Sequence, residues 1–508
     1  MRDPDELISW SSDWASLRVV VLGLGVTGFS AADTLVELGC EVLVVAERAS
    51  RERSDLLSVI GARLVIQDDA SHVPDELLDF APALVIVSPG YPMDHVVLTW
   101  AAESGITVWG DIELAWRLRD KTGTPAQWIV VTGTNGKTTT VQLTTHLLRA
   151  AGLRAESVGN IGVPVLDAIR HPEGYDVLVV ELSSFQLHWI RTTGPGALHP
   201  LASACLNVAD DHLDWHGGRA GYEEAKARVY ANTVVACVYN KADPVTIRMV
   251  EQAEVVEGCR AIGFDLGTPG MSDFGLVGDI IVDRAFLDDR RGTALELTTH
   301  GELQAAGLAS PHMVANVLAA SALSRAAGVP AEVVRDALQT FRVDHHRTET
   351  IGAANDVLWV DDSKATNPHA TQAALSAFAS VVWIVGGLLK GVDIGDLVHA
   401  NANRIKAAVV IGVERGAVVA AFARHAPDVP VFEVIAADTS EVMPEAVRLA
   451  ASVAGAGDVV LLAPAAASMD QFTDYGDRGD RFAAAVLDHL GGATDDHNPE
   501  SGDSQSSS

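Results

Sequence analysis

The sequence VTGTNGKTTT, residues 131–140, decides the fold that we expect for the middle of this chain. An apolar segment at 128–131 precedes it and favours a strand, and the segment 141–151 favours a helix. Between a strand and a helix, glycines let backbone amides approach phosphate, Lys137 can reach terminal phosphates, and the Thr138 hydroxyl suits a magnesium ion. The spacing GxxGKT is two residues shorter than the general GxxxxGKS/T pattern. The stretch predicts a nucleotide-binding P-loop, with a Gly/Thr turn that binds nothing as the alternative.

A second glycine-rich turn, GLGVTG at 23–28, lies upstream. It follows an apolar run at 17–22, and it precedes a helix-compatible segment, an expected strand at 42–45 and then Glu47. This order is the dinucleotide-binding pattern, in which amides at a helix N-terminus hold phosphate and the acid holds a ribose. The turn predicts another phosphate cradle; the alternative is that its glycines only permit a tight turn.

Length, composition and charge limit the class of protein. A chain of 508 residues suggests about three domains, and 48% hydrophobic with 20% charged residues is typical of globular enzymes. The net charge of -31 argues against a nucleic-acid partner. The four cysteines are too far apart to predict a zinc site or a disulfide framework, which favours a reducing cytoplasm. Residues 1–10 lack the regions of a signal peptide, and we expect no membrane span.

Three polar residues of the central part are candidates for catalysis. Glu181 ends an expected strand at 177–181, where a carboxylate can hold magnesium beside a P-loop; the alternative is a cap for the next turn. His212 lies in an acid-rich loop, and such a histidine alone is more often structural. Lys226 lies on an expected helix, and its spacing from Glu223 favours a surface lysine in an i,i+3 pair.

The third part repeats a strand and helix rhythm after residue 341. Expected strands at 357–360, 381–385 and 459–462 each run into a polar segment. Because the carboxyl ends of parallel strands form the ligand-binding edge of an open sheet, a functional group of side chains is expected there. Its members are Asp362, Lys364, Thr366, Lys390 and Ser468, each of which could alternatively be a helix cap.

Eight motifs together resemble the Mur ligases over about residues 15 to 490. The motifs are GTNGKTT at 133–139, GNIG at 159–162, ELSSFQL at 181–187, NVADDHLD at 207–214, AKARVY at 225–230, HR at 346–347, DDSKATN at 361–367 and SMDQF at 468–472. The resemblance implies an α/β protein of three domains. These are a Rossmann-like N-terminal domain at 1–122, a central P-loop ATPase-type domain at 123–341 and a C-terminal Rossmann-like domain at 342–491; the polar tail at 492–508 is expected to be disordered.

The resemblance also implies an activity, because ELSSFQL and SMDQF are similar to the D-glutamate-adding members of the family. Such enzymes use ATP to activate the carboxylate of UDP-N-acetylmuramoyl-L-alanine as an acyl phosphate. D-Glutamate then attacks, and phosphate leaves from a tetrahedral intermediate. The implied setting is peptidoglycan precursor synthesis by a cytoplasmic monomer. Its implied partners are small molecules, the two substrates and ATP, with no nucleic acid and no membrane. A sibling Mur ligase or a folylpolyglutamate synthase-like ligase is the alternative.

Residue roles carried over from the family fall into four groups. The catalytic group is Lys137, Glu181, His212 and Lys226. ATP contacts are implied for Gly133, Thr134, Asn135, Gly136, Lys137, Thr138, Thr139, Asn316, Arg347 and Asp362. UDP-substrate contacts are implied for Gly25, Thr27, Glu47, Ser88, Gly90, Asn160, Ser183 and Gln186. D-Glutamate contacts are implied for Lys364, Thr366, Lys390, Ser468 and Tyr475. The implied ligands of two Mg²⁺ ions are Thr138, Glu181, His212 and a carbamylated Lys226.

Two departures from the family pattern concern the nucleotides. Ser310, Pro311 and Met313 flank His312 where the family commonly has Gly, Gln and Asn, which puts the adenine contacts of this segment in question. Glu47 stands where Asp is frequent.

Two other classes compete with a ligase: a nicotinamide-dependent dehydrogenase with an added ATPase, and a P-loop switch or motor. Neither accounts for DDSKATN or SMDQF.

Overall fold

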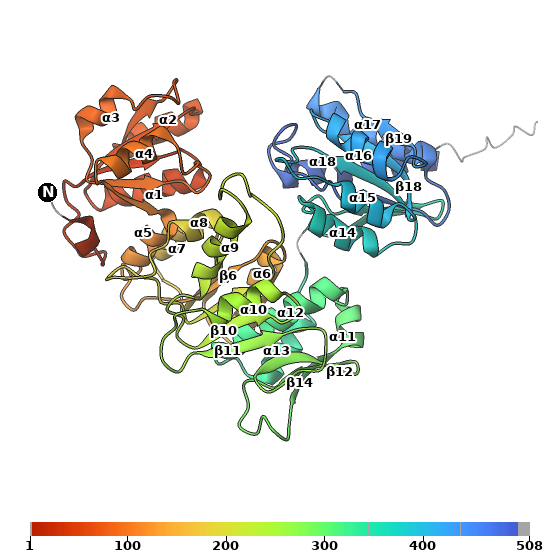
Figure 1. The fold of residues 1–508 in the computed structure, drawn as a ribbon, viewed down its shortest axis with the longest axis horizontal. Helices are drawn as coiled ribbons and strands as arrows, with labels where there is room; N and C mark the ends of the chain where they lie inside the picture. Colours follow the sequence, from red (N-terminus) through yellow and green to blue (C-terminus); the bar gives the residue numbers. More distant parts are fainter. Residues whose placement is uncertain (1–2, 344, 437, 496–508) are drawn as a thin grey trace, which may run out of the picture. The chain divides into compact units, whose positions relative to one another are not determined.

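The computed structural model describes residues 3–343, 345–436 and 438–495 (Figure 1). The chain divides into two compact units, Met1–Arg342 and Val343–Ser508. The described residues form three sheets, two in the first unit and one in the second. The predicted α/β class with three sheet-based domains is confirmed. The predicted boundaries after residues 122 and 341 stay predictions.

The first sheet is parallel throughout, in the order β3-β2-β1-β4-β5. Its strands are β1 (Arg18–Leu22), β2 (Glu41–Ala46), β3 (Arg63–Ile66), β4 (Leu84–Val87) and β5 (Thr107–Gly110). Its helices are η1 (Pro4–Glu6), α1 (Val26–Glu37), α2 (Arg51–Ile60), α3 (Asp75–Phe80) and α4 (Val96–Glu103). The strand order reverses at β1, so the loops after β1 and β4 flank the switch point, where ligands of such sheets bind.

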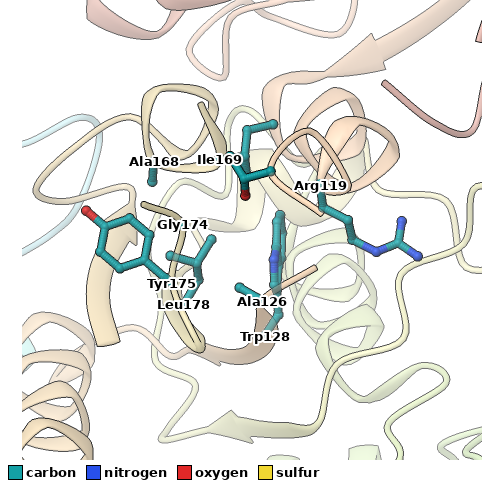
Figure 2. Close-up of a pocket in the computed structure, with 9 residues that line it drawn as sticks. Arg119, Ala126, Trp128, Ala168, Ile169, Gly174, Tyr175 and Leu178 are labelled. Atoms are coloured by element: carbon teal, nitrogen blue, oxygen red, sulfur yellow. The ribbon is translucent and has the colours of Figure 1, made fainter. Parts of the chain in front are cut away.

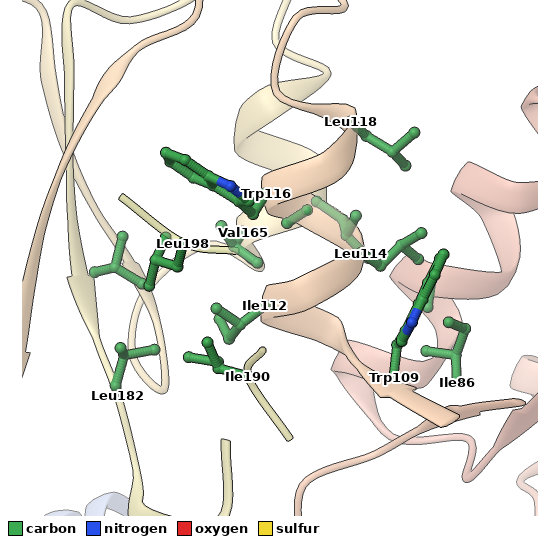
Figure 3. Packing of buried hydrophobic residues seen from close by; sticks show 14 of the residues in the cluster. Ile86, Trp109, Ile112, Leu114, Trp116, Leu118, Val165, Leu182, Ile190 and Leu198 are labelled. Atoms are coloured by element: carbon green, nitrogen blue, oxygen red, sulfur yellow. The ribbon is translucent and has the colours of Figure 1, made fainter. Parts of the chain in front are cut away.

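Helix α5 (Asp111–Leu118) joins the first sheet to the second through a shared core (Figure 3). All eight of its residues are buried. Leu114 lies among side chains of the first sheet, such as Trp109, while Ile112 lies toward Leu182 and Ile190 of the central part. Apolar side chains of α5 are buried on both sides, and each Å² of apolar surface removed from water contributes roughly 25 cal/mol of stability. The helix therefore joins the first two sheets into one unit.

The second sheet has the order β14-β13-β12-β11-β10-β9-β6-β8-β7. Its strands are β6 (Gln127–Thr132), β7 (Ala155–Gly159), β8 (Val177–Glu181), β9 (Ala202–Cys205), β10 (Ala236–Asn240), β11 (Arg260–Phe264), β12 (Asp273–Val277), β13 (Ile280–Asp283) and β14 (Leu295–Thr299). Its helices are α6 (Lys137–Ala150), α7 (Val165–Ile169), α8 (Ser184–His188), α9 (Arg219–Ala227), η2 (Arg228–Tyr230), α10 (Pro244–Glu251), α11 (His300–Ala305), α12 (Pro311–Ala326) and α13 (Ala331–Leu338). Strand β6 lies between β8 and β9, so the segments that follow these three strands meet at one edge.

The second unit holds a six-stranded sheet in the order β15-β16-β20-β17-β18-β19. Its strands are β15 (Glu349–Ala354), β16 (Val357–Asp361), β17 (Val381–Gly386), β18 (Ile405–Ile411), β19 (Val431–Glu433) and β20 (Val459–Leu462). Its helices are α14 (Pro368–Ser376), α15 (Gly395–Asn401), α16 (Gly416–His425), α17 (Thr439–Val453) and α18 (Tyr475–Asp495). Among the described strands of this sheet, only β15 is antiparallel to its neighbour. The predicted tail at 492–508 overlaps the end of α18 and otherwise lies outside the described residues.

A search of the described helices finds none that is both long enough and apolar enough to cross a membrane.

Candidate active site

The predicted P-loop connects β6 to α6. Gly136 caps the helix with φ +81°, in the left-handed region that favours glycine. A Cβ added to Gly136 would lie 2.5 Å from Oδ1 of Asn316, a buried residue of α12. The loop therefore requires glycine here, and the structure brings to it Asn316, for which the family resemblance implies an ATP contact.

Asn207 holds the P-loop from the neighbouring strand. It follows β9, and its Oδ1 accepts a hydrogen bond from Asn135 N at 2.9 Å, while its Nδ2 donates to Asn135 O at 3.1 Å. Its own carbonyl accepts from Thr134 N at 2.9 Å. Sequence reasoning missed this residue, although it opens the NVADDHLD motif. Three hydrogen bonds to or from one asparagine thus hold the backbone of the P-loop in place.

Two lysine side chains converge on the P-loop. Lys137 Nζ donates to the carbonyl oxygens of Gly133 and Thr134, both at 2.9 Å, and Lys226 Nζ donates to the Gly133 oxygen at 2.9 Å. Lys226 is only 2% exposed. Its spacing favoured a surface lysine, and that interpretation is wrong because α9 turns this face toward the loop. Burial, and then the charge of Lys137, lower the pKa of Lys226 to about 7.

Glu181 ends β8 beside the P-loop strand, as predicted. It is 2% exposed, and its Oε1 accepts from Asn160 Nδ2 at 2.9 Å. Its Oε2 is buried and makes no hydrogen bond with any described residue. The alternative role as a helix cap is wrong, because Ser183 caps α8. An acceptor left over in a buried site is a suitable ligand for a cation.

The structure gives Ser183 and Gln186 a role in shaping the site. They form a capping box, in which Gln186 N donates to Ser183 Oγ at 3.1 Å and Ser183 N donates to Gln186 Oε1 at 3.1 Å. Gln186 Nε2 donates to Asp111 at 3.0 Å, and burial raises the pKa of Asp111 to about 6. Gln186 is buried. The side-chain amide of Gln186 thus already bonds to Ser183 and Asp111. Ser183 is half-buried.

His212 lies in the loop after β9 with φ +51°. Its Nε2 is 3.6 Å from Asp211 Oδ1, and its ring lies 4.6 Å from the Phe185 ring. Asp211 and Glu181 both act electrostatically on Lys226, which places these groups around the same loop. Within the described parts of the chain, no three His, Cys, Asp or Glu side chains form a metal cluster. The predicted metal set, with Thr138 and Lys226, contains only two such residues, Glu181 and His212, and it stays a prediction.

The first glycine-rich turn lies at the switch point of the first sheet. A Cβ on Gly28 would lie 2.1 Å from Gly23 O, and one on Gly23 would lie 2.7 Å from Ser88 Oγ and 2.8 Å from the Tyr91 ring. The turn thus requires both glycines, and it brings Ser88 beside it as predicted. Ser88 Oγ is buried and has no hydrogen-bond partner in the described chain.

The remaining predicted residues of this cradle are exposed, except for half-buried Thr27. Gly25 caps α1, and Thr27 is in the first turn of that helix. Glu47 and Gly90 are exposed at the ends of β2 and β4. Glu47 acts electrostatically on Tyr91, whose pKa is raised mainly by burial. An exposed acid and free helix amides at a switch point are the features of a nucleotide cradle.

In the second unit, the DDSKATN segment connects β16 to α14. Lys364 Nζ lies 3.5 Å from the centre of the Tyr475 ring. This is a cation–π contact between two residues that are predicted to bind D-glutamate. Asp362 Oδ1 accepts from Thr348 N at 3.1 Å, and burial raises its pKa to about 7, against the opposing charge of Arg347. The structure therefore places Asp362 and Arg347 near each other.

Lys390 and Ser468 follow strands that lie next to each other. Lys390 is exposed after β17 with φ +53°, and Ser468 is buried after β20. Leu388 and Ala467 exchange backbone hydrogen bonds at 2.9 and 3.0 Å, which holds the two segments together. Thr366 follows β16, the other neighbour of β20. The residues that are predicted to bind D-glutamate thus follow the ends of three adjacent strands.

A small pocket lies at the opposite end of the central sheet (Figure 2). Trp128 and Leu178 line it from near the starts of β6 and β8, whereas the P-loop and Glu181 follow the ends of the same strands. Arg119 and Tyr175 complete much of its wall. Its position at the amino ends of parallel strands separates it from the candidate active site.

Three family models match the chain. Mur ligase MurD-like, N-terminal domain, matches residues 17–110; Mur ligase middle domain matches 131–324; Mur ligase, glutamate ligase domain, matches 346–466. Each match covers one of the three sheets.

Similar proteins extend along nearly the whole chain. UDP-N-acetylmuramoylalanine--D-glutamate ligase of Leifsonia xyli subsp. xyli is 62% identical over 96% of both chains. The protein of the same name from Streptomyces avermitilis is 48% identical over 94% of this chain and 99% of its own. Among solved structures, UDP-N-acetylmuramate-alanine ligase from Thermotoga maritima is 18% identical with a TM-score of 0.55, covering 93% of this chain and 100% of its own. The latter likeness supports the fold alone.

Proposed function

This chain belongs to the Mur ligase family, and from that premise we propose that it is the ATP-dependent ligase that joins D-glutamate to UDP-N-acetylmuramoyl-L-alanine. The observation that carries the proposal is the 62% identity, over 96% of both chains, to a protein named for this reaction. We further propose that it acts as a cytoplasmic monomer in peptidoglycan precursor synthesis.

The P-loop edge has the chemistry that ATP and Mg²⁺ require. Glycine at position 136 lets a phosphate approach the backbone amides at the start of α6. Lys137 supplies a cation, and Thr138 supplies a hydroxyl. The buried and unpartnered Oε2 of Glu181 fits a divalent cation. Glu181, His212 and Thr138 would hold Mg²⁺, which supplies charge neutralisation when the substrate carboxylate meets the γ-phosphate. Arg347 and Asp362 would add nucleotide contacts from the second unit.

Lys226 fits a carbamate. Carbamate formation joins a neutral amine to CO₂ and releases a proton, so it needs an amine that is unprotonated near neutral pH. Burial lowers the pKa of Lys226 to about 7, which gives a substantial neutral fraction. The product is an anion, and it would replace repulsion between Lys226 and Lys137 with attraction while providing a metal ligand.

Substrate positions follow from the two remaining sites. The first cradle, with exposed Glu47 and helix α1, would hold the UDP end, and Asn160 and Ser183 would lie along the muramoyl part. Lys364, Thr366 and Lys390 would bind the carboxylates of D-glutamate, with Ser468 and Tyr475 beside them. Cations that hold both carboxylates leave the amine free to attack the acyl phosphate, so positioning supplies much of the rate enhancement.

The test is release of inorganic phosphate by the purified full chain. We expect release to require ATP, Mg²⁺, UDP-N-acetylmuramoyl-L-alanine and D-glutamate together. Release with L-alanine, L-lysine or meso-diaminopimelate in place of D-glutamate would assign the chain to a sibling ligase. Release with a folate and L-glutamate would favour a folylpolyglutamate synthase-like activity, and release without an amino acid would favour a simple ATPase.

A further inference from the structure

An aromatic bridge links the first cradle to the His212 loop. The indole Nε1 of Trp215 donates a hydrogen bond to the carbonyl oxygen of Tyr91 at 3.0 Å. Tyr91 follows β4, and its ring lies against Gly23 of the glycine-rich turn. Trp215 lies three residues after His212. One side chain thus spans the two sheets of the first unit, at the ligand-binding edge of each.

The bridge continues from Trp215 to the predicted magnesium loop. The ring of Phe185 lies 4.7 Å from the Trp215 ring and 4.6 Å from the His212 ring. His216 packs 4.6 Å from Trp215, and its Nε2 lies 2.9 Å from Ser184 Oγ. Burial lowers the pKa of His216 to about 4, so this ring stays neutral and packs as an apolar group at neutral pH. The chain of contacts from Gly23 to His212 is therefore continuous.

Trp189 provides a comparison within the same cluster. Its ring lies 4.9 Å from His188, which in turn lies 5.4 Å from Trp215. Its Nε1 is buried, yet it has no hydrogen-bond partner in the described parts of the chain. Both tryptophans are half-buried aromatic residues of the central part, but only Trp215 bonds to the loop of the first cradle.

We infer that Trp215 is a positioning residue that fixes the distance between the first cradle and the His212 loop, so that one sugar nucleotide reaches both. This inference rests on the proposed function, in which the UDP end occupies the first cradle and the reacting carboxylate lies near the metal loop. A ligand that touches both ends depends on their separation, whereas ATP at the P-loop does not touch Tyr91. Loss of this hydrogen bond should therefore weaken binding of the sugar nucleotide more than binding of ATP.

The experiment compares Trp215→Phe with Trp189→Phe in the full chain. Each variant keeps an aromatic ring and loses an indole N–H, but only the first loses a hydrogen bond. For Trp215→Phe we expect the Kd and KM for UDP-N-acetylmuramoyl-L-alanine to rise about 3- to 10-fold, the effect of one neutral hydrogen bond. The KM for ATP should stay within about twofold, and Trp189→Phe should leave all these values near those of the unaltered chain.

Three outcomes would overturn the inference: an unchanged Kd in Trp215→Phe, an equal rise in both variants, or an equal rise in the KM for ATP. Calorimetric Kd values are measured without turnover, so they separate the bridge from the reaction. If the unaltered chain binds the sugar nucleotide but releases no phosphate with D-glutamate, the proposed function fails while the bridge is still tested. If Trp215→Phe does not fold, Trp215→Leu, which is also apolar and lacks an N–H donor, replaces it and should bind the sugar nucleotide more weakly without a change for ATP.

Discussion

Lys226 and Lys137 donate hydrogen bonds to the same carbonyl oxygen, that of Gly133, each at 2.9 Å. Burial of Lys226, and then the charge of Lys137, lower the pKa of Lys226 to about 7. The P-loop therefore lies against an amine, that of Lys226, whose pKa is near neutral. This pair connects the fold to the chemistry that we propose.

Removal of the Lys226 side chain should nearly abolish turnover. In Lys226→Ala we expect a loss of about 100-fold or more, because a metal ligand and its charge are removed together. A small carboxylic acid such as formate should restore part of the activity by occupying the vacated space. Steady-state rates with and without formate give the result, and full activity in a folded Lys226→Ala variant would contradict the proposal.

The same lysine predicts a dependence on bicarbonate and pH. Because its pKa is lowered to about 7, the neutral amine predominates above pH 7 and the ammonium predominates below it. Protein depleted of CO₂ should regain activity on addition of bicarbonate quickly at pH 8 and several-fold more slowly at pH 6. Intact-mass measurement at pH 8 should show a labile addition of one CO₂ that Lys226→Ala lacks. Equal recovery rates at both pH values would argue against a carbamate on this residue.

Lys137→Ala should remove the charge needed at the γ-phosphate. We expect turnover to fall by about 100- to 1000-fold while Tm changes little, because half-buried Lys137 bonds only to its own loop in the contacts described. Lys406→Ala is the control: Lys406 pairs with Asp458 in the second unit and should leave turnover near normal. Near-normal turnover in Lys137→Ala would refute the P-loop assignment.

Asn207→Ala should loosen the P-loop. The substitution removes the two side-chain hydrogen bonds to Asn135, which are worth about 1–3 kcal/mol together, so the KM for ATP should rise about 5- to 100-fold. Asn401→Ala is a matched control, because Asn401 is a buried asparagine with comparable bonds in the second unit. It should lower Tm without changing the KM for ATP. An unchanged KM for ATP in Asn207→Ala would show that the loop keeps its shape without this residue.

How far the sequence predicts this site depends on whether a side chain acts alone or through another residue. The ends of β8 and β20 were predicted at Glu181 and Leu462, because buried parallel strands are continuous apolar runs. Glu181 was placed beside the P-loop by its position at the end of a strand, whereas Asn316 was assigned there only through the family resemblance. The burial of Lys226 was not predicted from spacing, since helical periodicity does not say which face of α9 meets another element.

Contacts between distant residues were beyond local reasoning. The bond from Gln186 to Asp111 and that from Trp215 to Tyr91 join segments 75 and 124 positions apart. No turn signal or periodicity encodes such a pair, because each depends on how two sheets pack across α5. The antiparallel strands β12–β14 and β15 were also missed, since each contains half-buried or exposed positions instead of a continuous buried run.

Asp362→Asn should stabilise the second unit in a pH-dependent way. Burial raises the pKa of Asp362 to about 7, above its value near 4 in the unfolded chain, so the folded unit loses stability as pH rises from about 4 to 7. The amide removes that cost and can still accept from Thr348 N. We expect Tm to rise by about 2–6 °C at pH 8 and by less at pH 5, while ATP binding weakens.

Asp458→Asn is the control with the opposite sign. Although burial opposes it, hydrogen bonds from Lys406 and Ser380 lower the pKa of Asp458, so its contribution to stability is present above pH 4 and is lost as pH falls. This variant should lower Tm at pH 8. If both variants shift Tm in the same direction at pH 8, the environments assigned to these two carboxylates are wrong.

Selectivity for D-glutamate should depend on Lys390. We propose that this exposed lysine binds one carboxylate of the incoming amino acid while Lys364 and Thr366 bind the other. Lys390→Ala should therefore raise the KM for D-glutamate by about 10-fold or more, the effect of one charge-assisted hydrogen bond, and should leave the KM for ATP within about twofold. Lys390 has a positive φ, a backbone conformation that costs most residues other than glycine roughly 1 kcal/mol or more. Lys390→Asn, which tolerates this conformation, therefore serves as a second variant.

Stereochemistry follows from the same anchoring. If both carboxylates are held, inverting the α-carbon points the amine away from the acyl phosphate, and a misplacement of about 1 Å can cost about 100-fold in rate. We expect L-glutamate to bind measurably but to be joined at least about 100-fold more slowly than D-glutamate. Competition between the two enantiomers, followed by the identity of the product, measures this directly. Comparable incorporation would mean that a single carboxylate is anchored, and equal loss of both activities in Lys390→Ala would then identify Lys390 as that anchor.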